Sequence, residues 1–516
     1  MSATDRQKLL NTITIGSAVY ETIRQAGPIA YYKLDETASG TASTQEAGNS
    51  ADVLQDTLKQ KSFGTVPENA IKWGEGTGPA VDGSSAVMLA PTDRSNGIGL
   101  TTTFSNPMVN ANAATLLGFF NGSSTDGLLH TLFWLQDSTN GRVPRGYVQI
   151  GGTPGTNLYA EASITSEGST LKVTATKTGQ YFDGKTHLLA ATAALTGGQL
   201  VVTLFIDGVQ QAQATGATTV AQFPSLTMCA VGCQPTAAYI TAGTYSNAAW
   251  FDYALDGDTI ADVNSSGTTA FAGDTVDERI GRLAAWEGQG NLDLDTSDTV
   301  LGRHMPDSQS LQSAIQQAAN SEGGTTYVGG DGEIKFLTRL SKESTHVPLI
   351  TLSAERVGTT LSKTTDDALL VNKPVVKRLD TAVTATVIDQ ESSDIHGEHS
   401  KDFDTILSSN ADAQNYATYV LAFYGKPQPR CDQVEIECLT LQDWAHVLQV
   451  DMWQIIRITS MPSSEQSTTL DLFIEGWELS IMPESWKLIS DTSTAIPFGI
   501  LNDTVRGVCG ASVVGW

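Results

Sequence analysis

The chain has 516 residues, with 30 Lys and Arg against 56 Asp and Glu, a formal net charge of −26 at pH 7. This charge excludes a protein whose main affinity is for phosphate backbones, and it argues against docking on anionic membranes. Hydrophobic residues make up 40% of the chain and charged residues 17%, which indicates a globular protein rather than a disordered acidic segment. We expect no specific nucleic-acid binding and, since no apolar run approaches roughly 18 residues, no membrane span.

The N-terminus and the cysteines favour assembly in the cytoplasm. Residues 1–6 are polar and lack the apolar core of a signal peptide. The five cysteines are too few and odd in number for a disulfide framework, so we expect reduced thiols. Residues 1–27 are predicted to form an N-terminal arm, which Gly27-Pro28 separates from the next segment. The sequence leaves open whether the arm packs on its own chain or on a neighbouring subunit.

Residues 28–268 have the pattern of an antiparallel β domain. The apolar run 200–206 is followed by Asp207-Gly208 and a further short run, which is the strongest local signal for a hairpin. Asp82-Gly83 and Asp183-Gly184 likewise precede apolar runs. Because a long helical pattern is missing, the sequence favours a β-sandwich or jelly roll.

The same segment resembles a known family. Pro28–Glu36 followed by Ser39-Gly40 resembles the opening strand of laminin-G-like (concanavalin-A-like) jelly rolls. Asp183–His187 and Leu204–Gly208 resemble the paired central strands of that family. The resemblance implies a jelly-roll fold. It also leaves a bound Ca²⁺ open, although the sequence identifies no ligands for it, and we expect no other cofactor.

Beyond this domain the pattern changes to mixed helix and strand. Ser265–Thr269 is predicted to be a linker, and the elements after it follow from helical or alternating spacing and from Gly and Pro stops. They are helices over 276–286, 309–321 (capped by Asp307-Ser308) and 410–424, a hairpin over 325–336, mixed β structure over 361–387, and strands at 433–437, 453–458 and 470–476.

The order of these elements resembles minor tail (tail-tip) proteins of long-tailed bacteriophages, notably those of actinobacterial hosts. The segments that carry the resemblance are Ser308–Glu322, the hairpin ending at Phe336–Arg339, Asn372 with Val375-Val376, Ser393–Glu398, Ala411–Gly425 with Pro427 and Pro429-Arg430, Val450–Trp453, and Ile474–Gly476 with Pro483 and Trp486.

This second resemblance implies an architecture and a biological setting. The fold class is then multidomain and mainly β: the jelly roll is followed by an α+β tail-hub-like domain over 269–380 and by a helix plus β-barrel-like domain over 381–516. We expect a symmetric trimer or hexamer that contacts other phage tail proteins. The expected location is the tail tip or baseplate of the virion, assembled in the host cytoplasm. The jelly roll would then recognise the host surface, with a cell-wall polysaccharide as its expected ligand.

Candidate glycan-binding residues lie in the jelly roll. Lectin-type sites place an exposed aromatic ring against the apolar face of a sugar and use Asn or Asp for its hydroxyls. The candidates are Trp134, Tyr147 and Tyr159 for the ring, and Asp137 and Asn157 for the hydroxyls. The alternative for each aromatic is a place in the core of the sandwich.

Catalysis has little support in the sequence. There is no G-x-S-x-G nucleophile motif. The stretch nearest to the paired carboxylates of a glycosidase, Thr469–Glu475, lacks one of them and lies outside the jelly roll. His396–His399 is the most metal-like cluster but is not H-E-x-x-H. We therefore expect no catalytic residues, no metal site and no enzyme, with a cell-wall glycan hydrolase or a free-standing lectin as the alternatives.

Overall fold

The chain forms two compact units. The sandwich unit comprises Thr14–Phe271 with Met305–Gln309, and the mixed unit comprises Met1–Ile13, Ala272–His304 and Ser310–Trp516. The computed structural model describes residues 3–36, 42–44, 57–79, 85–93, 95–137, 145–166, 168–235, 239–304, 307–344, 347–357, 363–365, 367–427, 429–461, 468–482, 485–495, 498–499 and 513–514. Ser39-Gly40, Asp82-Gly83, Pro483 and Cys509, which the sequence analysis used, lie outside these residues.

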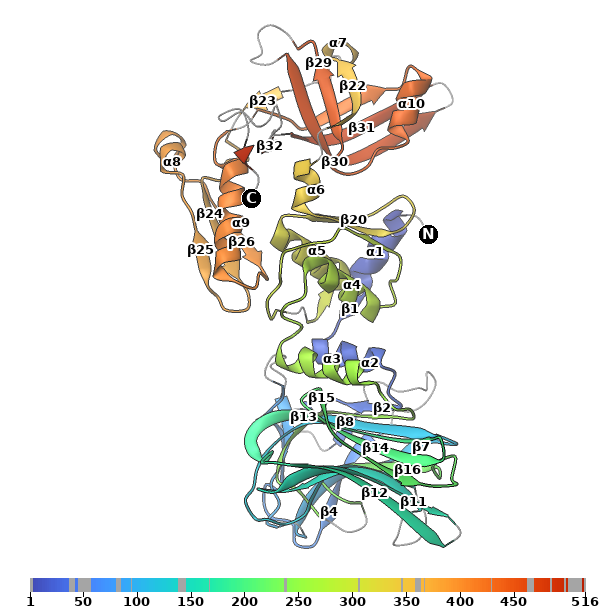
Figure 1. Ribbon diagram of the computed structural model, residues 1–516. Helices are drawn as coiled ribbons and strands as arrows, with labels where there is room; N and C mark the ends of the chain where they lie inside the picture. The colour runs from blue at the N-terminus through green and yellow to red at the C-terminus, as the bar shows by residue number, and fades with distance from the viewer. Residues whose placement is uncertain are drawn as a thin grey trace. The chain divides into compact units, whose positions relative to one another are not determined.

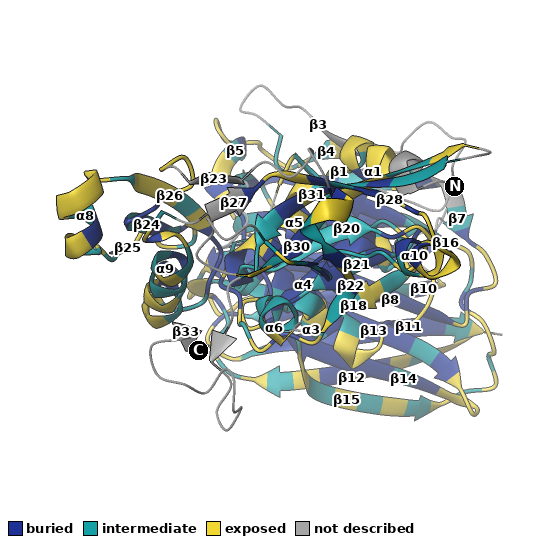
Figure 2. Cartoon of the chain, turned by 90° about the horizontal axis from the view of Figure 1, so that it is seen from above, coloured by how far each residue is buried: buried dark blue, intermediate teal, exposed yellow. Residues whose placement is uncertain are grey.

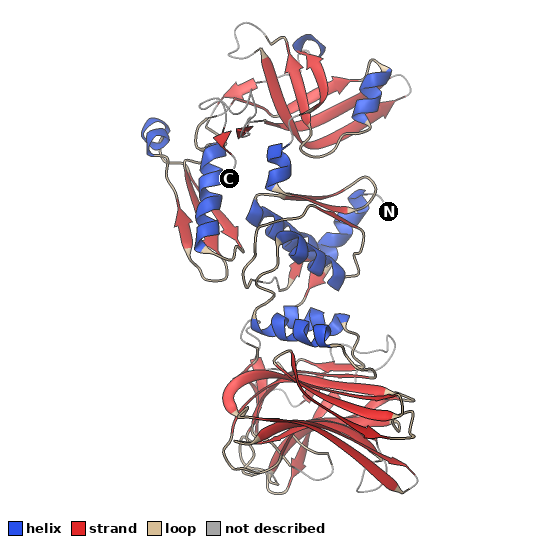
Figure 3. Ribbon diagram, viewed as in Figure 1, coloured by secondary structure: helices blue, strands red, loops and turns tan. Residues whose placement is uncertain are grey.

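Two antiparallel eight-stranded sheets make up the sandwich unit (Figures 1 and 3). The first sheet has the order β12-β11-β10-β9-β16-β7-β4-β3, and the second has the order β15-β14-β13-β8-β17-β6-β5 with β2 also on β17. The strands of the first sheet are β3 (Ala42–Thr44), β4 (Thr57–Phe63), β7 (Gly97–Met108), β9 (His130–Asp137), β10 (Gly146–Thr153), β11 (Asn157–Ser166), β12 (Ser169–Thr178) and β16 (Leu226–Val231). Those of the second are β2 (Ala30–Tyr32), β5 (Ile71–Thr77), β6 (Ser85–Leu89), β8 (Ala113–Ser123), β13 (Asp183–Thr196), β14 (Gln199–Ile206), β15 (Val209–Ala217) and β17 (Gly243–Phe251). The prediction of a jelly-roll-like sandwich is confirmed.

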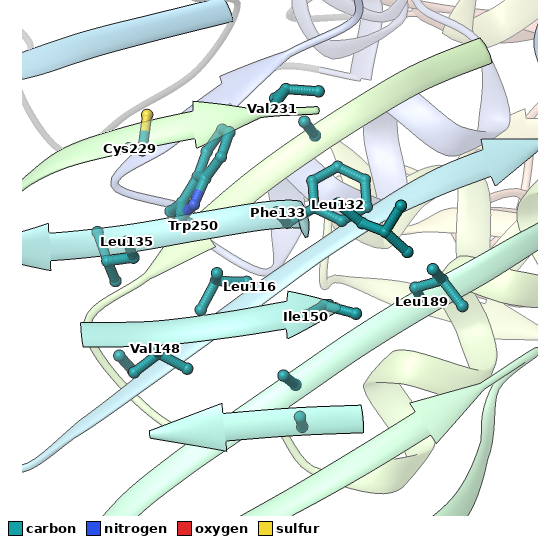
Figure 4. Close-up of a cluster of buried hydrophobic side chains, with 14 of the residues drawn as sticks. Leu116, Leu132, Phe133, Leu135, Val148, Ile150, Leu189, Cys229, Val231 and Trp250 are labelled. Atoms are coloured by element: carbon teal, nitrogen blue, oxygen red, sulfur yellow. The ribbon is translucent and has the colours of Figure 1, made fainter. Parts of the chain in front are cut away.

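The core lies between the two sheets. Trp250 of β17 is fully buried in the same core cluster as Phe133, Val148 and Ile150 of the first sheet (Figure 4). The Trp250 indole N–H donates to the carbonyl of Trp134 at 3.2 Å. This bond satisfies the one polar group of the indole, and the rest of the ring packs against apolar side chains. Since successive residues of a strand point to opposite faces, Val148 and Ile150 in the core fix Tyr147 and Gln149 on the outward face of β10.

The predicted hairpin at Asp207-Gly208 is confirmed. Asp207 (φ 52°) and Gly208 (φ 78°) both adopt the left-handed conformation between β14 and β15, as a two-residue type I′ turn requires. Asp183-Gly184 differs from the prediction, because it lies within β13, where the pairing with β8 is irregular between Asp183 and Thr186.

The predicted linker at Ser265–Thr269 was wrong. Most of it is the end of helix α3 (Gly257–Thr268), whose first turn is capped by Asp256, the carboxylate accepting from Thr259 N at 2.7 Å. Ser, Thr and Gly are weak helix formers, but Ile260 and Val263 are buried with Phe251 of the second sheet. Burial therefore outweighs propensity here, and α3 packs beside α2 (Ala18–Gln25) (Figure 1).

The mixed unit contains the helices and sheets predicted after residue 270. Its helices are α1 (Ala3–Thr12), α4 (Val276–Trp286), α5 (Leu311–Glu322), α6 (Arg339–Ser344), α7 (Ala354–Val357), α8 (Gln390–His396), α9 (Asn410–Tyr424) and α10 (Leu441–Val447). One three-stranded sheet joins β18 (Leu292–Leu294), β21 (Ile334–Leu337) and β20 (Thr325–Val328). A second joins β25 (Thr384–Thr386), β24 (Lys373–Arg378) and β26 (Ser400–Thr405).

A five-stranded sheet in the order β22-β29-β30-β31-β28 completes the mixed unit. Its strands are β22 (Pro348–Ser353), β28 (Gln433–Glu437), β29 (Ile455–Thr459), β30 (Thr469–Met482) and β31 (Ser485–Thr494). Further short strands of this unit are β23 (Lys363–Thr365), β27 (Pro429–Cys431), β32 (Phe498–Gly499) and β33 (Val513–Val514). The short strand β1 (Thr14–Ile15) belongs to the sandwich unit and pairs with β19 (Gln309–Ser310). Among the described helices, none has the length and hydropathy needed to cross a membrane.

Several boundaries differ from the prediction. The border at 380/381 falls between β24 and β25, which belong to one sheet. Helix α5 begins at Leu311 and is capped by Ser310, whose hydroxyl accepts from Ser313 N at 3.2 Å, rather than by Asp307-Ser308. The N-terminal arm divides between the units, because α1 packs on α5 and α2 packs on α3. Both of these helices pack on their own chain.

Candidate functional site

The outward face of the first sheet carries rows of polar and aromatic side chains. The strand register aligns Thr174, Glu161, Gln149 and Trp134 in one row across β12, β11, β10 and β9. A neighbouring row holds Lys172, Ser163, Tyr147 and Gln136. Because these positions alternate with residues of the core between the sheets, they all point away from that core. Trp134 is nevertheless buried in a second cluster with Ala230, Cys233 and Ile240, and Tyr147 packs against this cluster.

Glu161 is the centre of this face. Its Oε1 accepts from Tyr147 Oη at 2.6 Å and from Gln149 Nε2 at 2.8 Å. Its Oε2 accepts from Thr174 Oγ1 at 2.9 Å and pairs with Lys172 Nζ at 2.8 Å. Glu161 is only 4% exposed, so water reaches little of it. The four donors take the place of water, because a carboxylate has about four lone-pair sites.

The four donors keep Glu161 ionised. Burial raises the pKa of a carboxyl, but the hydrogen bonds from Lys172, Tyr147 and Gln149 and the charge of Lys172 outweigh it, so the pKa of Glu161 lies below its ordinary value. Burial and the bond to Glu161 raise the pKa of Tyr147, so that the phenol stays neutral. Glu161 therefore acts as an acceptor that orients its neighbours and is not suited to donate a proton.

Trp134 and Tyr147 form a stacked pair. Their ring centroids are 4.7 Å apart and their planes differ by 16°. Trp134 is 3% exposed, and its indole N–H donates to Gln136 Oε1 at 2.8 Å. Tyr147 is half-buried, so its ring rather than the indole of Trp134 is the one that a ligand can reach.

The other three predicted residues occupy different places. Tyr159 shares the face of Glu161 and lies across Gly151, where an added Cβ would approach Tyr159 Oη to 2.5 Å. Asn157 Oδ1 accepts from the Thr153 backbone N–H at 3.3 Å in the turn between β10 and β11. Asp137 lies at the end of β9, is 4% exposed and accepts from Gly146 N at 3.4 Å. The structure thus brings the three predicted aromatics to one face, while Asn157 and Asp137 make backbone contacts at strand ends.

Sequence reasoning missed the residues that organise this face. Glu161, Gln149, Lys172 and Thr174 join Tyr147 in one network. A signal was present, because Glu161 is the one charged residue in the mostly apolar segment Leu158–Ile164. A charged residue inside such a strand is usually paired when buried.

The open side of the face is β12. Lys172, Thr174 and Thr176 are exposed there, and Figure 2 colours the chain by burial. Among the described residues, no second carboxylate belongs to the Glu161 network, and no group of three or more His, Cys, Asp or Glu is placed to hold a metal ion. In the His396–His399 segment, where the sequence predicted no metal site, Glu398 is paired with Lys373 at 2.7 Å.

Comparison with known proteins adds similar folds but no family. No protein-family model and no curated protein matches the chain. A native heptameric SAP-like pentraxin from Limulus polyphemus is similar at 10% identity over 40% of this chain and 81% of that chain, with a TM-score of 0.25. Domain 4 of an extracellular GH43 arabinanase from Geobacillus stearothermophilus, solved with arabinotriose, is similar at 16% identity. The match covers 46% of this chain and 98% of that chain, with a TM-score of 0.28. A CBM40 domain of a Ruminococcus gnavus IT-sialidase is similar at 15% identity. The match covers 30% of this chain and 84% of that chain, with a TM-score of 0.24.

At these identities and TM-scores the likenesses establish neither a family nor a ligand for this chain. The class that its own fold defines is a mainly β, multidomain protein with a jelly-roll-like sandwich.

Proposed function

We propose that the sandwich unit is a carbohydrate-binding module and that the outward face of its first sheet is the binding surface. The observation that carries the proposal is the network around Glu161, which fixes the groups that a ligand would meet. The hydroxyl proton of Tyr147 is committed to Glu161 at 2.6 Å, so its oxygen is presented as an acceptor beside its ring. Lys172 keeps two further N–H donors after pairing with Glu161 at 2.8 Å.

Such a surface suits hydroxylated ligands. Sugars combine apolar ring faces with hydroxyls that both donate and accept, and binding is favoured when the protein groups are already oriented. A ring, an acceptor and a donor held by one buried carboxylate meet this requirement without rearrangement. Host cell-wall polysaccharide is the ligand that the sequence resemblance implies.

A charge-matched pair of variants tests this proposal. The full chain is titrated with solubilised bacterial cell-wall polysaccharide, and Lys172→Gln is compared with Lys185→Gln, a side chain that is 79% exposed on the second sheet. We expect Lys172→Gln to weaken binding about tenfold, because it removes a charged donor, and Lys185→Gln to leave it unchanged. Equal effects of the two variants, or no binding by the unmodified chain, would contradict the proposal.

We further propose that the whole chain is a structural component of a bacteriophage tail tip or baseplate, where it forms a symmetric ring and displays the sandwich to the host. The ordered resemblance after residue 300 supports this, as does an apolar surface on the mixed unit. Leu439, Leu441, Ile481 and Met482 are 56–81% exposed, which is unusual for a monomer. We call these four residues the α10 surface and infer that a second copy of the chain covers it.

Local contacts hold the α10 surface together. Trp444 of α10 stacks on Trp486 at 5.1 Å, and Trp486 faces Ile481 across the β30–β31 hairpin. Light scattering of Leu441→Asp is expected to give a monomer where the unmodified chain gives a trimer or hexamer. Ile395→Asp, at another largely exposed position on α8 (68%, against 81% for Leu441), is the control. A monomeric unmodified chain, or a chain missing from virions in immunolabelling, would leave the free-standing lectin as the better account.

A catalytic role has less support. Glu161 is ionised and fully engaged, whereas a glycosidase needs a second carboxyl that can donate a proton. We therefore propose that the protein acts by binding and assembly and without catalysis. Release of reducing sugars from cell-wall material by the purified chain would favour the glycan hydrolase instead.

A further inference from the structure

The mixed unit contains a cavity that none of the functions above uses. Its volume is about 670 Å³, and it is bounded by the end of α5, by α6, β26 and α9, and by β30 and β31. This volume lies within the range of about 300–1,000 Å³ that is usual for small-molecule sites. Segments far apart in the sequence therefore converge on one hollow.

Tyrosines of α9 form one wall of the cavity. Tyr416, Tyr419 and Tyr424 all line it, and the Tyr416 ring also contacts that of Phe403 on β26, with centroids 5.8 Å apart. The guanidinium of Arg339 lies 4.7 Å from the centre of the Tyr419 ring, a cation–π contact that helps to fix this ring. None of the three hydroxyls has a hydrogen-bond partner among the described residues. Burial raises the pKa of Tyr416 to about 12, so this hydroxyl remains a neutral donor.

The charges of the cavity are of two kinds. Lys342 is paired with Glu475 at 2.7 Å, and Glu475 also accepts from the Trp453 indole at 3.0 Å. The charges of Lys342 and Glu475 therefore neutralise each other. Lys401 of β26, in contrast, lies over the Phe403 ring at 5.3 Å and has no ion pair within the described part of the chain. The cavity thus presents one uncompensated ammonium group in a chain with a net charge of −26.

We propose that this cavity binds a sugar ring that carries an anionic group, such as a uronic acid or a sugar phosphate. The tyrosine rings provide flat apolar surfaces for the C–H face of the sugar. Their hydroxyls and the Asn320 amide are left to bond its hydroxyls, and Lys401 is placed to pair with its carboxylate or phosphate. The site is separate from the sandwich face and does not depend on it.

Calorimetric titration of the full chain tests the proposal. The ligands are glucuronic acid, glucose 1-phosphate, glucose and inorganic phosphate. We expect saturable binding of at least one anionic sugar, about tenfold tighter than glucose or phosphate alone, since a charge-assisted bond adds at least that factor. Lys401→Gln should reduce the affinity for the anionic sugar to that for glucose. Tyr419→Phe should lower the affinity for both the anionic sugar and glucose.

Controls separate this site from the sandwich. Lys487→Gln removes the same charge from β31 outside the cavity and should change nothing, and Lys172→Gln in the sandwich should also leave this binding intact. Absence of saturable binding of both anionic sugars would overturn the proposal. So would phosphate binding as tightly as the sugar phosphate, or unchanged affinity in Lys401→Gln.

Discussion

Replacing Glu161 by Ala tests the network on the sandwich face most sharply. The change removes the acceptor of the Gln149 amide and the Tyr147 hydroxyl, at 2.8 and 2.6 Å. A buried donor left without a partner costs about 1–3 kcal/mol. Thr174 and Lys172 are exposed, so water replaces their lost bonds and they add little. Two fully buried donors would cost about 2–6 kcal/mol, but Tyr147 is only half-buried and water can reach part of it. We therefore expect a loss in the lower part of this range, about 2–4 kcal/mol, in the free energy of unfolding.

The assay is urea unfolding of the full chain, with hydrogen exchange of peptides from β10 and β11 as a local measure. Lys172→Ala is the matched variant, because it removes one partner of the same carboxylate from the exposed side, and a surface ion pair is worth about 0–1 kcal/mol. The reasoning would be refuted if Glu161→Ala cost no more than Lys172→Ala. Because the pKa of Glu161 is lowered in the folded state, its contribution is present above the unfolded pKa and is lost as the pH falls through the folded value.

Three further predictions concern single residues. His187 lies between Asp207 and Asp183, which raise its pKa above the ordinary value of 6.5. Its stabilising contribution is therefore present below the unfolded pKa and is lost as the pH rises through the folded value. Thermal melts at pH 5 to 8 should show a melting temperature that falls with rising pH, and His187→Gln should remove this slope. Gly151→Ala would place a Cβ 2.5 Å from Tyr159 Oη; a destabilisation of about 1–3 kcal/mol is expected in urea unfolding, and a neutral result would mean that the ring of Tyr159 moves freely. Arg279 is fully buried and pairs with Asp274 at 3.0 Å; Arg279→Met should cost about 3–5 kcal/mol, and an unchanged melting temperature would contradict that role.

Local patterns predicted the elements that local interactions determine. The helix Val276–Trp286 has acidic residues in its first turn and apolar residues on one side, and the turn at Asp207-Gly208 needs two left-handed residues. Helix α3 was missed because its stability comes from packing on a sheet formed by distant strands. Local propensity contains no trace of such contacts.

The candidate site shows the same division. Tyr147 and Tyr159 were predicted from residue type alone, and the structure places both on one face. The role of Glu161 depends on the register of three strands, β10, β11 and β12, which pairs it with Gln149 on one side and Thr174 on the other. The cavity in the mixed unit depends on segments that are about 170 residues apart, from Asn320 to Ser493, and no short pattern marks it.

The central claim is that the face around Tyr147 and Glu161 binds carbohydrate. The most direct measurement is a glycan array probed with the full chain and with Tyr147→Ala side by side. The account predicts that the unmodified chain binds a defined set of glycans and that Tyr147→Ala loses them while its far-ultraviolet circular dichroism stays unchanged. Binding of the same glycans by both proteins would contradict the claim and move the search for the site to another surface.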